Sequence, residues 1–153
     1  MFQFFKRKAA DLFTIEQKER IVNAVKTAEL QTSGEVRIFI ESKCRFVNPI
    51  DRAKEIFDEL NMYNTAERNA VLVYIAMSHR QLAIYGDVGI YQKTGATFWN
   101  EQVKTMISHF NSSDYVEGIC EVVLSIGDAL ATHFPYDKVN DVNELPDDIV
   151  FGI

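Results

Sequence analysis

The sequence is poor in the residues and segments that mark specialised classes of protein. It has 2 cysteines, 3 prolines and 7 glycines among 153 residues. Cys44 and Cys120 lie far apart and form no C-x-x-C pair, which argues against a disulfide framework or a zinc site. No run approaches the ~20 apolar residues of a membrane span. The apolar start, Met1–Phe5, is short and precedes its basic cluster, unlike a secretory signal. We therefore expect one cytoplasmic domain.

A concentrated basic surface is also lacking. The net charge is −6, and residues 136–153 carry five acidic residues against Lys138 alone. Nucleic acid binding requires a basic face, so this distribution argues against it. We expect an acidic flexible tail over 136–153 and an N-terminal extension over 1–12. Either segment is a candidate for contact with a protein partner or a membrane surface, and the sequence leaves the oligomeric state open.

The patterns that are present predict an α/β fold. Thr14 with Gln17 forms a capping box, and Asn48-Pro49 opens a second helix. Short runs rich in β-branched or apolar residues predict strands at 35–41, 70–76 and 81–85. Two further helices are expected after the third strand. The order is α-β-α-β-β-α-α. We expect a mixed central sheet of about four strands sandwiched between helices.

This order predicts a polar edge of the sheet. A strand–helix–strand unit favours parallel pairing, and the tight turn at 78–80 makes the third predicted strand antiparallel. The start of the first strand, the start of the second and the end of the third therefore meet, with Glu35, Glu67, Arg68, Asn69 and Asp87 among the residues there.

The chemistry of that edge suits a hard cation. We expect Glu35, Asp87, Asn69 and Glu67 to supply oxygen ligands, and Ca²⁺ tolerates irregular geometry better than Mg²⁺. Gly86 and Gly89 would permit close backbone approach and unusual dihedral angles. The alternative is a simple turn, in which Asp87 bonds its own backbone and Glu35 pairs with an arginine on the surface.

Four ordered motifs resemble the TPM domain family. They are Ser33-Gly34-Glu35-Val36-Arg37-Ile38, Arg68-Asn69-Ala70-Val71-Leu72-Val73-Tyr74, Ala83-Ile84-Tyr85-Gly86-Asp87-Val88-Gly89-Ile90 and Phe98-Trp99. The likeness covers 13–135, and the chain looks like the short bacterial form of the family. The resemblance implies calcium binding at the sheet edge, with Glu35 and Asp87 at the family's acidic positions.

The resemblance also implies a second possible function, because one plant member is described as an acid phosphatase. The sequence has no D-x-D motif, and Cys44 is not followed six residues later by an arginine. Arg68 and Trp99 remain candidate contacts for an anion or another ligand. We therefore predict a non-catalytic calcium-binding or interaction module, with a metal-dependent phosphatase of phosphate monoesters as the alternative.

Overall fold

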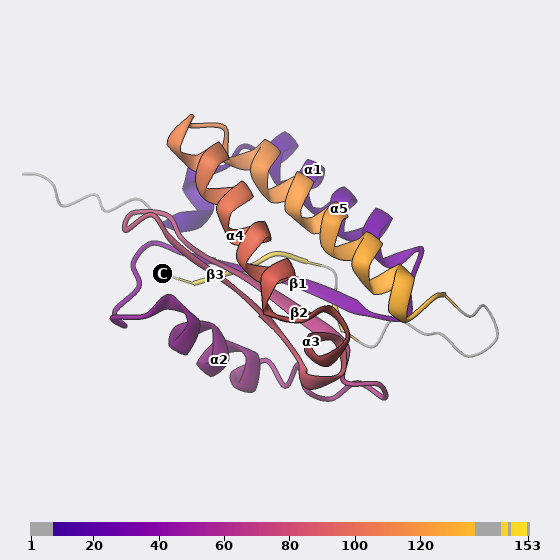
Figure 1. Ribbon diagram of the computed structural model, residues 1–153. Helices are drawn as coiled ribbons and strands as arrows, with labels where there is room; N and C mark the ends of the chain where they lie inside the picture. The colour runs from indigo at the N-terminus through magenta and orange to yellow at the C-terminus, as the bar shows by residue number, and fades with distance from the viewer. Residues whose placement is uncertain (1–7, 137–144, 147, 153) are drawn as a thin grey trace, which may run out of the picture.

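The computed structural model describes residues 8–136, 145–146 and 148–152. Its centre is a four-stranded sheet in the order β3-β2-β1-β4 (Figure 1). The strands are β1 (Glu35–Glu41), β2 (Ala70–Ala76), β3 (Gln81–Gly86) and β4 (Val150–Phe151). β1 pairs in parallel with both β2 and β4, whereas β2 and β3 are antiparallel. The predicted mixed sheet is confirmed.

Helices cover both faces of the sheet. One face is covered by α1 (Ile15–Glu29), α4 (Ala96–Asn111) and α5 (Tyr115–His133), and the other by α2 (Pro49–Glu59) (Figure 1). A short 3-10 helix, η1 (Ala9–Leu12), precedes α1, and α3 (Val88–Thr94) follows β3. The two predicted caps are present, since Thr14 and Gln17 form the capping box of α1 and Asn48 caps α2. No helix among the described residues is long and apolar enough to cross a bilayer.

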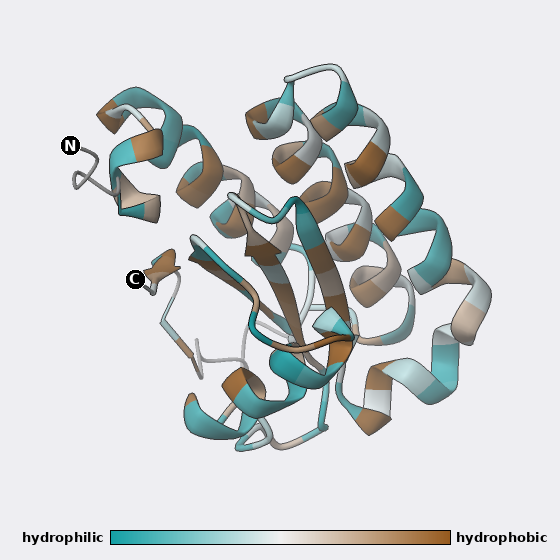
Figure 2. Cartoon of the chain, turned by 90° about the vertical axis from the view of Figure 1, so that its left-hand side faces the viewer, coloured by the Kyte–Doolittle hydropathy of each residue, from teal (hydrophilic) through white to brown (hydrophobic). Residues whose placement is uncertain are grey.

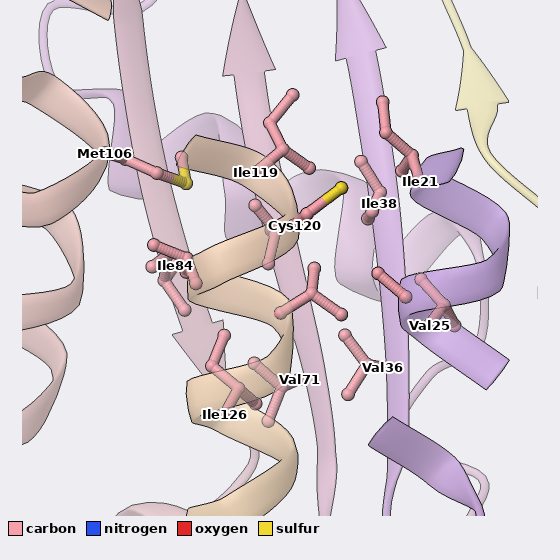
Figure 3. Packing of buried hydrophobic residues seen from close by; sticks show 14 of the residues in the cluster. Ile21, Val25, Val36, Ile38, Val71, Ile84, Met106, Ile119, Cys120 and Ile126 are labelled. Atoms are coloured by element: carbon pink, nitrogen blue, oxygen red, sulfur yellow. The ribbon is translucent and has the colours of Figure 1, made fainter. Parts of the chain in front are cut away.

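Alternating residues of the strands feed two separate hydrophobic clusters. Val36, Ile38 and Val71 point toward α1 and α5 (Figure 3). Leu72 and Tyr74 lie in the second cluster, beneath α2. Every residue of β2 is buried, as expected for a central strand covered on both faces. Hydrophobic colour is accordingly concentrated on the strands and on the inner sides of the helices (Figure 2).

The register brings the predicted polar edge together. Glu35 lies opposite Ala70 in the parallel pair, and Val71 lies opposite Gly86 in the antiparallel pair. The starts of β1 and β2 therefore lie beside the end of β3. The same edge of the sheet therefore holds Arg68 and Asn69, which precede β2, and Asp87, which follows β3.

Two elements differ from the sequence-based expectation. The stretch after Gly86 is a helix, α3, capped at its N-terminus by Asp87; the prediction of a turn there overlooked the capping role of the aspartate. At the other end of the chain, β4 pairs with β1, and Ile149 and Phe151 pack against the core. These apolar residues thus dock on the domain. The predicted acidic tail of 136–153 lies outside the described residues at 137–144, 147 and 153, and the predicted N-terminal extension of 1–12 does so at 1–7.

Candidate functional site

The polar edge is organised around a buried aspartate. The side chain of Asp87 is only 1% exposed, while that of Arg68 is 47% exposed. Arg68 Nε donates to Asp87 Oδ2 at 2.6 Å, and Nη2 donates to Oδ1 at 2.8 Å. These bonds to Asp87 raise the pKa of the Arg68 guanidinium. The result is a two-point ion pair, a geometry that fixes both partners in orientation.

Backbone contacts hold this ion pair in place. Asp87 N–H donates to Ala70 O at 3.0 Å, and Gly89 N–H donates to Arg68 O at 2.8 Å. Asp87 Oδ1 also accepts from Val88 N–H at 2.8 Å, which caps α3. The aspartate therefore bonds its own local backbone, as the turn alternative required, and bonds a cation across the sheet edge as well.

The two predicted glycines act through close approach alone. A Cβ atom on Gly89 would lie 2.2 Å from Glu67 O and 2.5 Å from Arg68 O. The expectation of unusual dihedral angles at Gly86 and Gly89 is wrong, because neither has a positive φ. Arg68 instead adopts the left-handed conformation, with φ of 52°. The unusual backbone conformation at this edge is thus that of Arg68, the residue whose side chain bonds Asp87.

Asn69 lies at the centre of a second polar group. Its Nδ2 donates to Ser33 Oγ at 3.3 Å, and Ser33 Oγ donates to Glu67 Oε2 at 3.0 Å. The Asn69 side chain is buried, and its Oδ1 has no hydrogen-bond partner in the structure. An unpaired buried acceptor costs free energy, and a donor or cation bound to this oxygen would remove that cost. Sequence reasoning missed Ser33, although it stands two residues before Glu35.

Glu35 has a different partner from Asp87. It is buried at 3% exposure, and its Oε1 accepts from Leu145 N–H at 2.7 Å. Its backbone N–H donates to Asn69 O at 3.4 Å. The alternative of a surface pair with arginine does not describe this carboxylate. Its bond to Leu145 ties the C-terminal segment to the start of β1, and no local pattern in the sequence indicates this contact.

The predicted ligand contact Trp99 lies in α4, above the end of β3. It is 5% exposed, and its ring would meet a Cβ atom on Gly86 at 2.9 Å. Its indole Nε1 is buried without a hydrogen-bond partner. Trp99 therefore packs on Gly86 and lines a pocket that also includes Tyr85 and Tyr91.

The edge thus assembles oxygen-bearing side chains without forming a closed metal centre. Within the residues that the structure describes, no group of three or more His, Cys, Asp or Glu side chains is placed to hold a metal ion. Asp87 is paired with Arg68, and Glu35 accepts from Leu145. The nearby carbonyls of Arg68, Asn69 and Ala70 already accept backbone hydrogen bonds. The donor chemistry, carboxylate and amide oxygen, remains that of a hard cation.

The histidines lie elsewhere in the fold. His79, in the turn between β2 and β3, contacts the backbone of Cys44 through Nδ1. His109, at the end of α4, contacts Glu121 of α5. The thiol of Cys44 is directed to Phe46 O, at 3.6 Å. Neither of these two imidazoles is thus paired with a cysteine thiol, a pairing that would activate the thiol as a nucleophile.

Comparison with solved structures agrees with this architecture. The chain is similar to the protein BA42 from the psychrophilic bacterium Bizionia argentinensis, with 33% identity and a TM-score of 0.83, covering 98% of this chain and 99% of that one. It shares its fold with the N-terminal domain of cg2496 from Corynebacterium glutamicum, at 11% identity and a TM-score of 0.63. An N-terminal domain from P. gingivalis has 17% identity and a TM-score of 0.66. Each of these two alignments covers 84% of both chains.

The family comparison covers most of the molecule. No curated protein matches the chain. The model of the TPM domain matches residues 7–129, which include all the predicted site residues from Glu35 to Trp99. The expected resemblance is confirmed, and the chain belongs to the TPM domain family.

Proposed function

We propose that this chain is a calcium-binding module whose cation is held at the polar edge of the sheet. The observation that carries the proposal is the buried Oδ1 of Asn69, which has no hydrogen-bond partner. Glu67 is linked to Asn69 through Ser33, and Asp87 and Glu35 flank the same strand ends. A set of oxygen ligands without nitrogen or sulfur suits Ca²⁺, whereas transition metals favour sites with nitrogen or sulfur ligands.

In the absence of a cation, Arg68 neutralises Asp87. Its guanidinium is half-exposed and reaches the carboxylate from outside, so it is free to swing into solvent without opening the core. Binding of Ca²⁺ exchanges one positive partner of Asp87 for another. Mg²⁺ is expected to bind more weakly, since it demands nearly ideal octahedral geometry.

The proposal does not extend to catalysis. A phosphatase requires a nucleophile or a metal-held hydroxide, and the polar side chains described here at the edge are carboxylates, an amide, a hydroxyl and a guanidinium already bonded to Asp87. A metal-dependent phosphatase stays the alternative. It predicts turnover of an aryl phosphate that Asp87→Asn abolishes.

Titration of the metal-stripped chain with Ca²⁺, followed by NMR, tests the proposal directly. We expect the side-chain amide of Asn69 and the backbone amides of Glu35, Asn69 and Asp87 to shift together. Asp87→Asn and Asn69→Ala should each weaken binding, whereas Asp128→Asn, an exposed acid in α5, should leave it unchanged. Shifts spread over exposed acids, or none at this edge at millimolar Ca²⁺, would exclude the site.

A further inference from the structure

β3 is an edge strand with an open side. It is the terminal strand in the order β3-β2-β1-β4, and no strand among the described residues pairs with its outer side. Edge strands are usually protected by charged residues or proline. The six residues of β3, QLAIYG, contain neither. β3 therefore carries neither of these two protective kinds of residue along its open side.

The hydrogen-bond pattern shows which backbone groups face outward. Asp87 N–H donates to Ala70 O, and the register continues this pair to Tyr85 with Leu72 and to Ala83 with Tyr74. Bonded and non-bonded pairs alternate in an antiparallel ladder. Ile84 and Gly86 therefore turn their N–H and C=O groups away from β2, toward the open side.

A pocket of about 510 Å³ lies at this position. Its lining includes Ile84 and Gly86, whose side of the sheet faces α4, and also Tyr85, which packs with α2 on the opposite side. Only a hollow along the strand's edge can be lined from both faces. Figure 1 shows α4 on one side of β3 and α2 on the other, so the pocket is a groove between two helices with the edge of a strand at its base.

The walls of the groove are mainly apolar. Val88 and Tyr91 of α3 are about half-exposed there, at 49% and 46%. Trp99 forms part of the wall, and its buried Nε1 donor has no partner. Among the residues that line the groove, Lys54 of α2 is the only one with a charge, and its Nζ lies 6.0 Å from the ring centre of Tyr85. Lys54 gives the groove one positive charge, which an acidic side chain of a ligand can neutralise.

We infer that this groove binds an extended peptide segment of a partner protein, which adds to the sheet as a strand beside β3. The peptide backbone satisfies the outward N–H and C=O groups of Ile84 and Gly86, as in other domains that recognise peptides by strand addition. One large apolar side chain fills the space beside Trp99 and Tyr91, and an acidic residue lies against Lys54. A small aromatic acid would fill the pocket but would leave the backbone groups unpaired.

Three blocked heptapeptides with valine and threonine at alternate positions provide the test. The first carries a central phenylalanine and one glutamate, the second replaces glutamate by lysine, and the third repeats the first with an N-methyl group on each backbone amide that faces β3. Binding is followed by the fluorescence of Trp99, the chain's single tryptophan, and by amide hydrogen exchange at Ile84 and Gly86.

We expect the first peptide to change the fluorescence and to slow exchange of these two amides. The lysine peptide should bind at least tenfold more weakly, and Lys54→Glu should invert that preference. Lys26→Glu, an exposed lysine of α1, serves as the control and should leave it unchanged. Tyr91→Ala should weaken binding of the first peptide in a folded protein, because Tyr91 is exposed.

Two outcomes overturn the inference. Equal binding of the N-methylated peptide would show that the groove accepts an apolar side chain without strand addition. Absence of any change at Ile84, Gly86 and Trp99 up to millimolar peptide would show that the groove binds no segment of this type. Neither outcome depends on Ca²⁺, so the result is independent of the proposed cation site.

Discussion

The carboxylate of Asp87 and the guanidinium of Arg68 form a two-point ion pair across the polar edge, with bonds of 2.6 and 2.8 Å. The acid is buried and the arginine is half in solvent. A buried carboxylate without a counter-ion is costly, so in the absence of another cation Arg68 is the group that makes the burial of Asp87 tolerable. Any cation that binds Asp87 competes with this arginine.

Arg68→Gln should therefore lower the melting temperature of the metal-stripped chain and increase the stabilisation that Ca²⁺ provides. The variant removes the charge that neutralises Asp87, and it removes the competitor at the same time. Differential scanning calorimetry with and without millimolar Ca²⁺ measures both effects through ligand linkage. Arg80→Gln is a matched control, because Arg80 is exposed and has nearly the same φ, 51° against 52°. A Ca²⁺ response no larger in Arg68→Gln than in the parent chain would contradict the competition.

Glu35→Ala should loosen the C-terminal segment. The change removes the acceptor of Leu145 N–H, and an unsatisfied buried donor costs about 1–3 kcal/mol. We expect the amides of Leu145, Val150 and Phe151 to exchange faster in hydrogen-exchange measurements, while those of β2 keep their protection relative to global unfolding. Glu35→Gln retains an acceptor oxygen and should have a smaller effect. Unchanged exchange in Glu35→Ala would show that β4 is held by its other contacts alone.

Gly89→Ala should destabilise the fold by about 1–3 kcal/mol or more, the usual range for overpacking. The new methyl group would fall 2.2 Å from Glu67 O and 2.5 Å from Arg68 O. Both are backbone atoms and cannot rotate aside, so the segment carrying Arg68 has to shift. Urea unfolding measures the loss. The neighbouring change Val88→Ala, at a half-exposed side chain, is expected to remain within about 1 kcal/mol; equal effects of the two would refute the close-approach role.

His109 should make stability depend on pH. A hydrogen bond with Glu121, together with Asp114 nearby, raises the pKa of His109 above its usual value. A raised pKa in the folded state favours the protonated form, so its contribution is complete below about 6.5 and is lost as pH rises through the folded pKa. The stability difference between the parent chain and His109→Gln, measured in urea, should shrink from pH 6 to pH 9. His133→Gln, in the last turn of α5, is the control, and a difference that does not change with pH would rule out this linkage.

Much of the fold could be predicted because local signals and topology agree. The apolar run 70–76 became a strand with every residue buried, and the short turn after it made β2 and β3 antiparallel. Close packing of α5 on α1 depends on Gly127, since a Cβ atom there would lie 2.6 Å from Ala28 Cβ. The strand Val150–Phe151 could not be predicted, because two residues have no periodicity and their partner, β1, lies more than a hundred residues earlier.

The site was less accessible to sequence reasoning. Element order correctly brought Glu35, Arg68, Asn69 and Asp87 to one edge, because parallel and antiparallel pairing determine which strand ends meet. It could not show that Asp87 pairs with Arg68 while Glu35 accepts from Leu145. Those partners depend on side-chain directions and on a distant segment. The open edge of β3 likewise could not be predicted, because it depends on the strand order of the sheet.

The pairing of β4 with β1 has a consequence for biosynthesis. β1 is synthesised more than a hundred residues before its second neighbour, which consists of Val150 and Phe151. One side of β1 therefore lacks its partner until these two residues have been made. Closing a loop of this length is entropically slow, so we expect the nascent domain to form its three-stranded sheet first and to receive the fourth strand last.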